Sequence, residues 1–231
     1  MAEDLDMVAV FVIAEGATEE KFIKQVVAPA LRHLRVYVKP QMLNTSQNAK
    51  GGAVTFDRLK FYARNTLKQH GDAVLSTFLD LYALDKNFPA FDEAKRKSDV
   101  YARVNCLEKA LQDAMVTYVD CRPERFLPHI QPHEYEGLLF SDVKALSAIE
   151  PNWAISLDRL SDVRASVETP EHINDGYETK PSKRLENLLH PKYQKTLHGP
   201  RAAERITLEV IERECRHFKA WMDSLRKLAP S

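Results

Sequence analysis

Several acidic residues of this sequence stand close to the point where a short apolar run ends. They are Glu15, Glu19, Asp80, Glu134 and Glu136. Carboxylates that folding brings together repel one another unless they are protonated or bridged by cations. Ligand sets made only of oxygen favour Mg²⁺ or Mn²⁺, and sites with two such ions support in-line phosphoryl chemistry. The acids therefore predict a metal centre that acts on phosphate esters.

Most of these acids also have a simpler explanation. Glu15 could be a solvated turn residue, and Glu19 could be a first-turn acid favoured by the helix dipole. Asp80 could be held by a salt bridge, and Glu134 could cap a following helix. We favour a metal role for Glu19 because it lies one helical turn after Glu15, and we rank Glu136 above Glu134 as a ligand.

The segments around the acids alternate between strand and helix patterns. Continuous apolar runs rich in β-branched residues are typical of strands buried on both faces of a parallel sheet. The predicted strands are 8–14, 36–43, 73–80 and 125–130, and the predicted helices between them are 18–34, 56–69 and 100–119. This alternation predicts an α/β fold with a mainly parallel sheet flanked by helices. The carboxyl ends of its strands would meet at one edge, where ligands bind in such sheets.

Three prolines limit these elements. Pro29 should kink or shorten the first helix. Pro40 predicts an edge position or an early end for the second strand, and Pro128 weakens the fourth.

The alternation of strand and helix patterns ends after Asp142. Residues 81–99 are predicted as a loop and 150–180 as loop-rich and acidic. Residues 182–189 and 201–228 have helical patterns, the latter as one or two helices. We therefore expect an α/β core over residues 1–145 and a loop-rich, helical C-terminal extension over 146–231 that packs on the core.

Basic residues gather in the C-terminal part, although the formal net charge of the 231-residue chain is zero. Lys183 is a candidate to neutralise a phosphate, and its alternative is a solvated cation at a helix start. Arg184, Lys195 and Arg201 could follow a nucleic-acid backbone, but a partner-binding face is equally compatible with them. His133 could act as a ligand or general base, whereas a lone histidine beside a turn is more often structural.

Other features limit the compartment and the chemistry. The three cysteines include no CxxC pair, which argues against a zinc site built on cysteines, and their odd number without a secretory leader favours a cytoplasmic protein. The apolar runs are too short for a membrane span. No Walker pattern is present, so ATPase activity would have to come from another chain.

The acidic motifs resemble those of the Toprim domain of topoisomerases, primases and overcoming-lysogeny-defect (OLD) nucleases. Glu15 and Glu19 are similar to the E-x-x-x-E first motif of the nuclease branch, and Glu134-x-Glu136 is similar to its later acidic motif. The resemblance implies a Toprim-like fold that binds Mg²⁺ or Mn²⁺ and cleaves nucleic acid. It also implies a lysine after the acidic motifs, a position for which Lys183 is the candidate.

A closer resemblance covers the chain from about residue 8 to 221. The phrases EGATEE, FLDLYAL, PHEYEGLLF, NDGYETKPSKR and LHGPRAAE are similar to an uncharacterised bacterial Toprim-like family. Members of that family are often paired with an ABC- or AAA-type ATPase in phage defence. The resemblance thus implies a metal-dependent nuclease or phosphodiesterase that acts with an ATPase partner.

One position departs from the Toprim pattern. Tyr82 stands where the second acid of the Asp-x-Asp motif is expected, and Asp85 has a different spacing. Without a carboxylate there, one cation loses a ligand. Two other functions therefore stay open, a catalytically weak binding module regulated by an ATPase and a different phosphoryl enzyme such as a nucleotidyl transferase.

Overall fold

A parallel β-sheet forms the centre of the computed structural model, which describes residues 7–43, 54–174 and 176–230. The strand order is β2-β1-β3-β4, and β5 pairs with the end of β3. The strands are β1 (Val8–Ala14), β2 (Val36–Met42), β3 (Val74–Asp80), β4 (Phe126–Leu127) and β5 (Ile130–Gln131). All pairs are parallel, so their carboxyl ends meet at one edge, as predicted.

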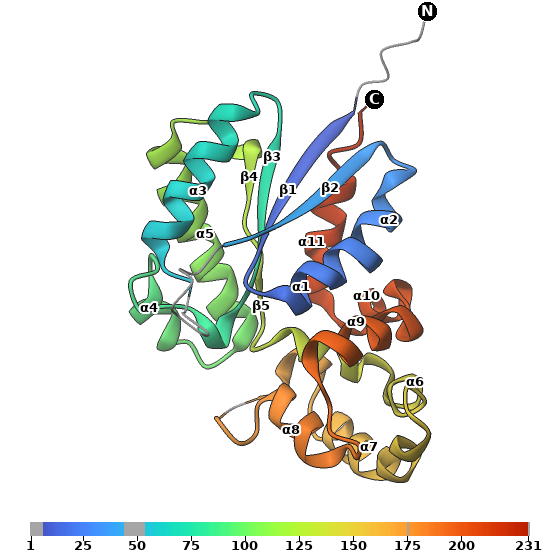
Figure 1. Ribbon diagram of the computed structural model, residues 1–231. Coiled ribbons are helices and arrows are strands. Elements are labelled where there is room, and N and C mark those ends of the chain that lie inside the picture. The colour runs from blue at the N-terminus through green and yellow to red at the C-terminus, as the bar shows by residue number, and fades with distance from the viewer. Residues whose placement is uncertain (1–6, 44–53, 175, 231) are drawn as a thin grey trace, which may run out of the picture.

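Strand β1 separates two hydrophobic cores because successive side chains of a strand point to opposite faces. Val10 and Val12 pack in one core, and Phe11 and Ile13 pack in the other. Helices α3 (Phe56–Gln69) and α5 (Val100–Val119) cover the Phe11 face. The opposite face is covered by α1 (Ala17–Phe22), α2 (Ala28–Arg32) and α11 (Arg216–Arg226), as Figure 1 shows. The predicted α/β architecture is confirmed.

The first helical segment continues past Pro29 with a local change of geometry. Between α1 and α2 lies a π-helical stretch, η1 (Ile23–Val27), and Pro29 sits at the start of α2. Proline lacks an N–H and its ring crowds the preceding turn, so the wider π turn before it accommodates both effects. Pro40 lies in β2, which is an edge strand as predicted.

Pro128 divides the predicted strand 125–130 into β4 and β5. At the break, the Thr77 hydroxyl accepts from the His129 N–H and donates to the His129 carbonyl, both at 2.9 Å. The Ser76 hydroxyl donates to the Leu127 carbonyl. Side chains of β3 thus replace ladder bonds at the interruption.

Two segments predicted as loops contain helices. Residues 81–99 include η2 (Leu81–Ala83) and α4 (Phe91–Lys95). Residues 150–180 include η5 (Pro151–Ser156), α7 (Leu157–Ala165) and η6 (Pro170–His172). The loop prediction for 81–99 was therefore wrong where α4 forms. In 150–180, Pro151 and Pro170 occupy the first turn of a helix, where the missing N–H costs nothing.

The remaining helices lie beyond the carboxyl edge of the sheet or return along it (Figure 1). They are η4 (Tyr135–Asp142), α6 (Val143–Ser147), α8 (Pro181–Leu188), α9 (Lys195–Ile206) and α10 (Leu208–Glu214), whereas η3 (Pro123–Arg125) precedes β4 at the amino end of the sheet. The segment predicted as one or two helices is three, because Thr207, with φ of 76°, and Cys215 interrupt it.

The C-terminal helices share a core with the sheet. Trp153, Leu160 and Phe218 belong to the same buried cluster as Val10 and Val12 of β1. The division at residue 145 stays a prediction. In the described part of the chain, no helix is both long and apolar enough to cross a membrane.

Candidate metal centre

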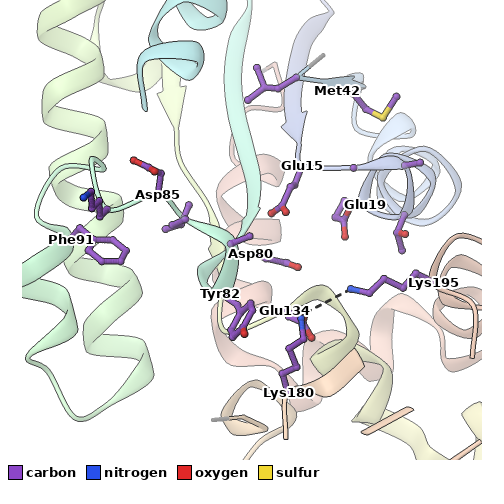
Figure 2. Close-up of a pocket in the computed structure, with 17 residues that line it drawn as sticks. Glu15, Glu19, Met42, Asp80, Tyr82, Asp85, Phe91, Glu134, Lys180 and Lys195 are labelled. Carbon is purple, nitrogen blue, oxygen red and sulfur yellow. Dashed lines mark hydrogen bonds and ion pairs between the residues drawn. The ribbon is translucent and has the colours of Figure 1, made fainter. Parts of the chain in front are cut away.

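The ends of β1 and β3 place three acids beside one pocket at the carboxyl edge of the sheet. Glu15 follows β1 directly, and Asp80 is the last residue of β3. Glu19 lies in the first turn of α1, where it is 7% exposed. Figure 2 shows the three carboxylates directed into the same open pocket, whose volume is about 1000 Å³.

A sharp turn brings two further acids to this pocket. His133 has a φ of 59°, in the left-handed region, and the next residues start the 3₁₀ helix η4. The turn directs the Tyr135 N–H to Asp80 Oδ1 at 2.8 Å. It also buries Glu134 and Glu136 beside Asp80, so that ligand oxygens of these three acids lie within 4.8 Å of one another.

Two lysines from the C-terminal part neutralise some of this charge. Lys180 Nζ lies 2.9 Å from Glu134 Oε1, and Lys195 Nζ lies 3.2 Å from Glu136 Oε2. The Lys195 ammonium is also 3.7 Å from Glu134 Oε1. Because five acids face two lysines, the site keeps an excess of three carboxylates.

The pKa values follow from burial and from this charge excess. Burial raises the pKa of Asp80 well above its ordinary value, and the neighbouring Glu19 and Glu15 raise it further. Burial likewise raises the pKa of Glu136, to about 7, although Lys195 opposes the change. The pKa values of Glu15 and Glu19 are also raised, mainly by burial.

Glu134 differs from its neighbours. Burial alone would raise its pKa, but Lys195, the Ser182 N–H and Lys180 together lower it. The Ser182 N–H, in the first turn of α8, donates to Glu134 Oε2 at 3.0 Å. The protein therefore stabilises the charge of Glu134 more than that of its two neighbours, because the pKa values of Asp80 and Glu136 stay raised.

The donor set fits a hard divalent cation. Every candidate ligand atom is a carboxylate oxygen, which suits Mg²⁺ or Mn²⁺. A bound cation would offset the neighbouring carboxylate charge, which adds to burial in raising the pKa values of Asp80, Glu136, Glu15 and Glu19. The burial of two of these acids supports this fit. Asp80 and Glu136 are 6% and 0% exposed, and the two carboxylates share one nearby lysine, Lys195.

The other predicted site residues lie in different surroundings. Lys183 pairs with Glu186 at 3.0 Å on α8, and the Arg184 guanidinium donates to the Thr179 carbonyl. Arg201 pairs with Glu150 at 3.3 Å. Lys195, predicted as a contact to nucleic acid, lines the acidic pocket and pairs with Glu136.

His133 is 9% exposed and lines a smaller pocket beside the acidic one.

Tyr82, the residue at the position that departs from the Toprim pattern, is exposed to solvent. Tyr82 is 46% exposed and lines the pocket, with Lys180 Nζ 4.3 Å from the centre of its ring. Asp85 also lines the pocket, but its Oδ1 accepts from the Asn87 N–H, and Figure 2 shows it apart from Glu15 and Asp80. A role for Asp85 in place of Tyr82 stays a prediction.

Sequence reasoning missed Lys180 and the buried tyrosine Tyr193. The Tyr193 hydroxyl lies 3.5 Å from Glu136 Oε1, and the hydroxyl of Tyr135 donates to the Gly199 carbonyl. A Cβ atom on Gly199 would lie 2.9 Å from the Tyr193 hydroxyl. Only glycine therefore allows α9 to lie so close to the Tyr193 ring. The one signal for Lys180 was the following Pro181, which marks a helix start.

Comparison with known proteins gives a family and a distant structural likeness. The family model described as "Domain of unknown function (DUF4276)" matches residues 14–226. Two structures of the C-terminal region of the Xanthomonas campestris pv. campestris OLD protein, phased with iodine and with platinum, are similar at 11% identity and a TM-score of 0.44. The alignments cover 94% of this chain and 94% and 92% of those chains. None of the curated proteins compared with the chain matches it.

Proposed function

The chain belongs to the DUF4276 family, and we propose that it is a divalent-metal-dependent phosphodiester hydrolase, a nuclease of Toprim type. The observation that carries the proposal is the convergence of Asp80, Glu134 and Glu136 within 4.8 Å at the carboxyl edge of a parallel sheet. Glu15 and Glu19 line the pocket beside them. The order of these motifs along the chain, which resembles the Toprim nucleases, supports the same reaction.

In this proposal Asp80, Glu134 and Glu136 hold Mg²⁺ or Mn²⁺, with Glu15 and Glu19 available for a second ion. A bound cation supplies Lewis acidity toward a phosphoryl oxygen and charge stabilisation for a leaving oxygen. The chain itself places two lysines, Lys180 and Lys195, at the pocket, where an anionic substrate would bind. The acids Glu136, Glu134 and Asp80 raise the pKa of Lys195 although burial opposes them, so this ammonium stays charged.

The open pocket and its exposed aromatic ring suit a polymeric substrate. Tyr82 presents a ring at the pocket wall, and aromatic side chains can stack on nucleobases. The basic residues Arg184 and Arg201 stay candidates for backbone contacts outside the pocket.

Cleavage assays with defined substrates test the proposal. Purified protein is incubated with duplex DNA, single-stranded DNA, RNA and transfer RNA in the presence of Mg²⁺, Mn²⁺ or EDTA. We expect metal-stimulated cleavage of one substrate class and a loss of at least about 100-fold in Glu15→Gln and Asp80→Asn. Asp113→Asn removes an exposed acid of α5 that pairs with Lys109 outside the pocket, and serves as the matched control. Unchanged cleavage in both site variants contradicts the proposal.

A pair of lysine variants separates two candidates for charge neutralisation. Lys183 carries the role in the sequence resemblance, whereas Lys195 has the contact to Glu136. We expect Lys195→Met to lose more activity than Lys183→Met, because only the former removes a cation that lies among the acids. The reverse order would assign the role to Lys183.

A second candidate function is a catalytically weak module that is regulated by an ATPase. Tyr82 favours it, because a tyrosine stands where a second carboxylate would complete the ligand set. Binding of labelled nucleic acid without cleavage in either metal would support this function. Restoring the acid in Tyr82→Asp and recovering cleavage would assign the deficit to that position.

The biological setting is a finer proposal that follows from the resemblance. We propose that the chain acts in the cytoplasm with an ABC- or AAA-type ATPase in phage defence. The three cysteines are free, which is compatible with a reducing compartment. Co-expression with an ATPase encoded beside it, followed by co-purification and phage plating, tests the setting separately from catalysis.

A further inference from the structure

A second group of metal-binding side chains lies outside the acidic pocket. It consists of Glu108 on α5, His129 between β4 and β5, and His217 in the first turn of α11. One ligand atom from each lies within 4.8 Å of the others. The group opens onto a separate pocket of about 300 Å³ that shares no lining residue with the acidic one.

The geometry of the group leaves ring nitrogens directed at one carboxylate. His217 Nε2 lies 2.8 Å from Glu108 Oε1, and His129 Nδ1 lies 3.8 Å from the same oxygen. The second distance is too long for a hydrogen bond. Ligand atoms from three separate elements are therefore gathered within 4.8 Å, and the contact between His129 Nδ1 and Glu108 is the one that lacks hydrogen-bond geometry.

Neighbouring groups hold each donor in place. His129 Nε2 lies 3.2 Å from Gln131 Oε1. That oxygen can only accept, so Nε2 carries the proton and Nδ1 keeps its lone pair toward Glu108. Such an orienting hydrogen bond on the far ring nitrogen accompanies metal-binding histidines in general. The His217 N–H donates to buried Glu171, and the Ile130 N–H fixes Glu108 Oε1 at 2.7 Å.

We propose that Glu108, His129 and His217 form a binding site for a divalent transition metal of the zinc class. Two imidazole nitrogens and one carboxylate are the donor set of zinc sites that keep a fourth position open, and here all three residues line the 300 Å³ pocket. The site differs from the acidic centre in ligand chemistry, because imidazole favours Zn²⁺ over Mg²⁺. The inference does not depend on the proposed nuclease activity.

The site would tie together three parts of the chain. A metal there links α5 and α11, which lie on opposite faces of the sheet, through the β4–β5 junction (Figure 1). His129 also stacks on Trp221 of α11, with ring centres 4.9 Å apart. Metal binding is therefore expected to stabilise the fold, since a ligand that binds only the folded state raises its stability.

Cobalt and zinc titrations test the site. The chelator-treated full chain is placed in excess Mg²⁺, which occupies the acidic centre, and Co²⁺ is added as a spectroscopic probe. We expect the visible absorption of tetrahedral Co²⁺ to saturate at one equivalent and to disappear when Zn²⁺ is added. Zn²⁺ should also raise the unfolding temperature.

Matched variants decide between a metal site and a hydrogen-bond network. Glu108→Gln keeps an acceptor for the Ile130 N–H but removes the carboxylate, and we expect Co²⁺ affinity to fall at least tenfold, by analogy with the roughly 10- to 100-fold losses from second-shell changes. Gln131→Ala should weaken binding by roughly 10- to 100-fold. His33→Ala, which alters an exposed histidine, should change nothing.

Two results would overturn the proposal. One is the absence of a cobalt spectrum at stoichiometric metal in the folded wild-type protein. The other is equal Co²⁺ affinity in wild type, Glu108→Gln and His217→Ala, with the same Zn²⁺-induced rise in unfolding temperature. Circular dichroism of each variant without metal tests whether it is folded. If His217→Ala is unfolded, the comparison of wild type with Glu108→Gln decides.

Discussion

The buried acid Glu136 makes the stability of the metal-free protein depend on pH in an unusual direction. Its pKa is raised from 4.5 to about 7, with burial as the main cause. Folding therefore favours the protonated form. The contribution to stability is complete below pH 4.5 and is lost as the pH rises through about 7.

The size of the effect follows from the shift. A difference of about 2.5 pKa units corresponds to about 3 kcal/mol, since one unit is worth about 1.4 kcal/mol. For a chain of this length, that amounts to a fall of roughly 6–12 °C in unfolding temperature across the range. Asp80, Glu15 and Glu19 have raised pKa values and act in the same direction.

Urea unfolding of chelator-treated protein between pH 5 and 8 measures this dependence. Wild type should become less stable as the pH rises, and Glu136→Gln should flatten the curve by about 3 kcal/mol. Added Mn²⁺ should restore stability to wild type at pH 8 and have little effect at pH 5, where the acids hold protons. The difference between the two proteins removes the contributions of histidines elsewhere.

A second glutamate, Glu186, provides the control for this experiment. Lys183 and Lys192 hold the pKa of Glu186 below its usual value although burial raises it, so Glu186 contributes stability that is present above pH 4.5. Glu186→Gln should therefore keep the wild-type slope between pH 5 and 8. Wild-type and Glu136→Gln curves that run parallel in the absence of metal would show that Glu136 does not titrate as a buried acid.

Three further substitutions test the packing around the site. Gly199→Ala should cost about 1–3 kcal/mol in urea unfolding, because its Cβ would lie 2.9 Å from the Tyr193 hydroxyl; Gly71→Ala, with nothing within 4 Å, is the control. Asp142→Ala should cost about 1 kcal/mol by removing the N-cap of α6, and Asp142→Asn should recover most of it. Arg125→Met should lower thermal stability by roughly 2 kcal/mol or more, because its guanidinium donates to three main-chain carbonyls at the α3–β3 turn; an unchanged unfolding temperature would contradict this.

The sequence was sufficient for the elements with strong local signals. Strand β1 and helix α5 have the predicted bounds because an uninterrupted apolar run and a 20-residue helical period leave little ambiguity. The parallel topology then followed from the alternation of strands and helices. Because all strands run the same way, acids at their ends could be expected at one edge, and the structure brings Glu15, Asp80 and Glu136 there.

The missing parts depend on contacts between distant segments. Lys180 lies 46 residues after its partner Glu134, and Lys195 lies 59 residues after Glu136. No local period encodes these contacts, since they arise from the docking of α8 and α9 against the carboxyl edge. His217 and Glu108 are 109 residues apart, so their meeting could not be inferred from spacing either.

Pro128 connects the two candidate sites. It ends β4 after two residues, and the chain pairs again as β5 only beside Leu79 and Asp80. The interruption leaves His129 at the junction, where Thr77 binds its main chain and its ring faces Glu108. The resumed strand then carries the chain past Asp80 to the left-handed turn that delivers Glu134 and Glu136. An unbroken strand would keep its residues in the alternating register of a sheet, so the break is what places a histidine on one side of β3 and the acids at its end.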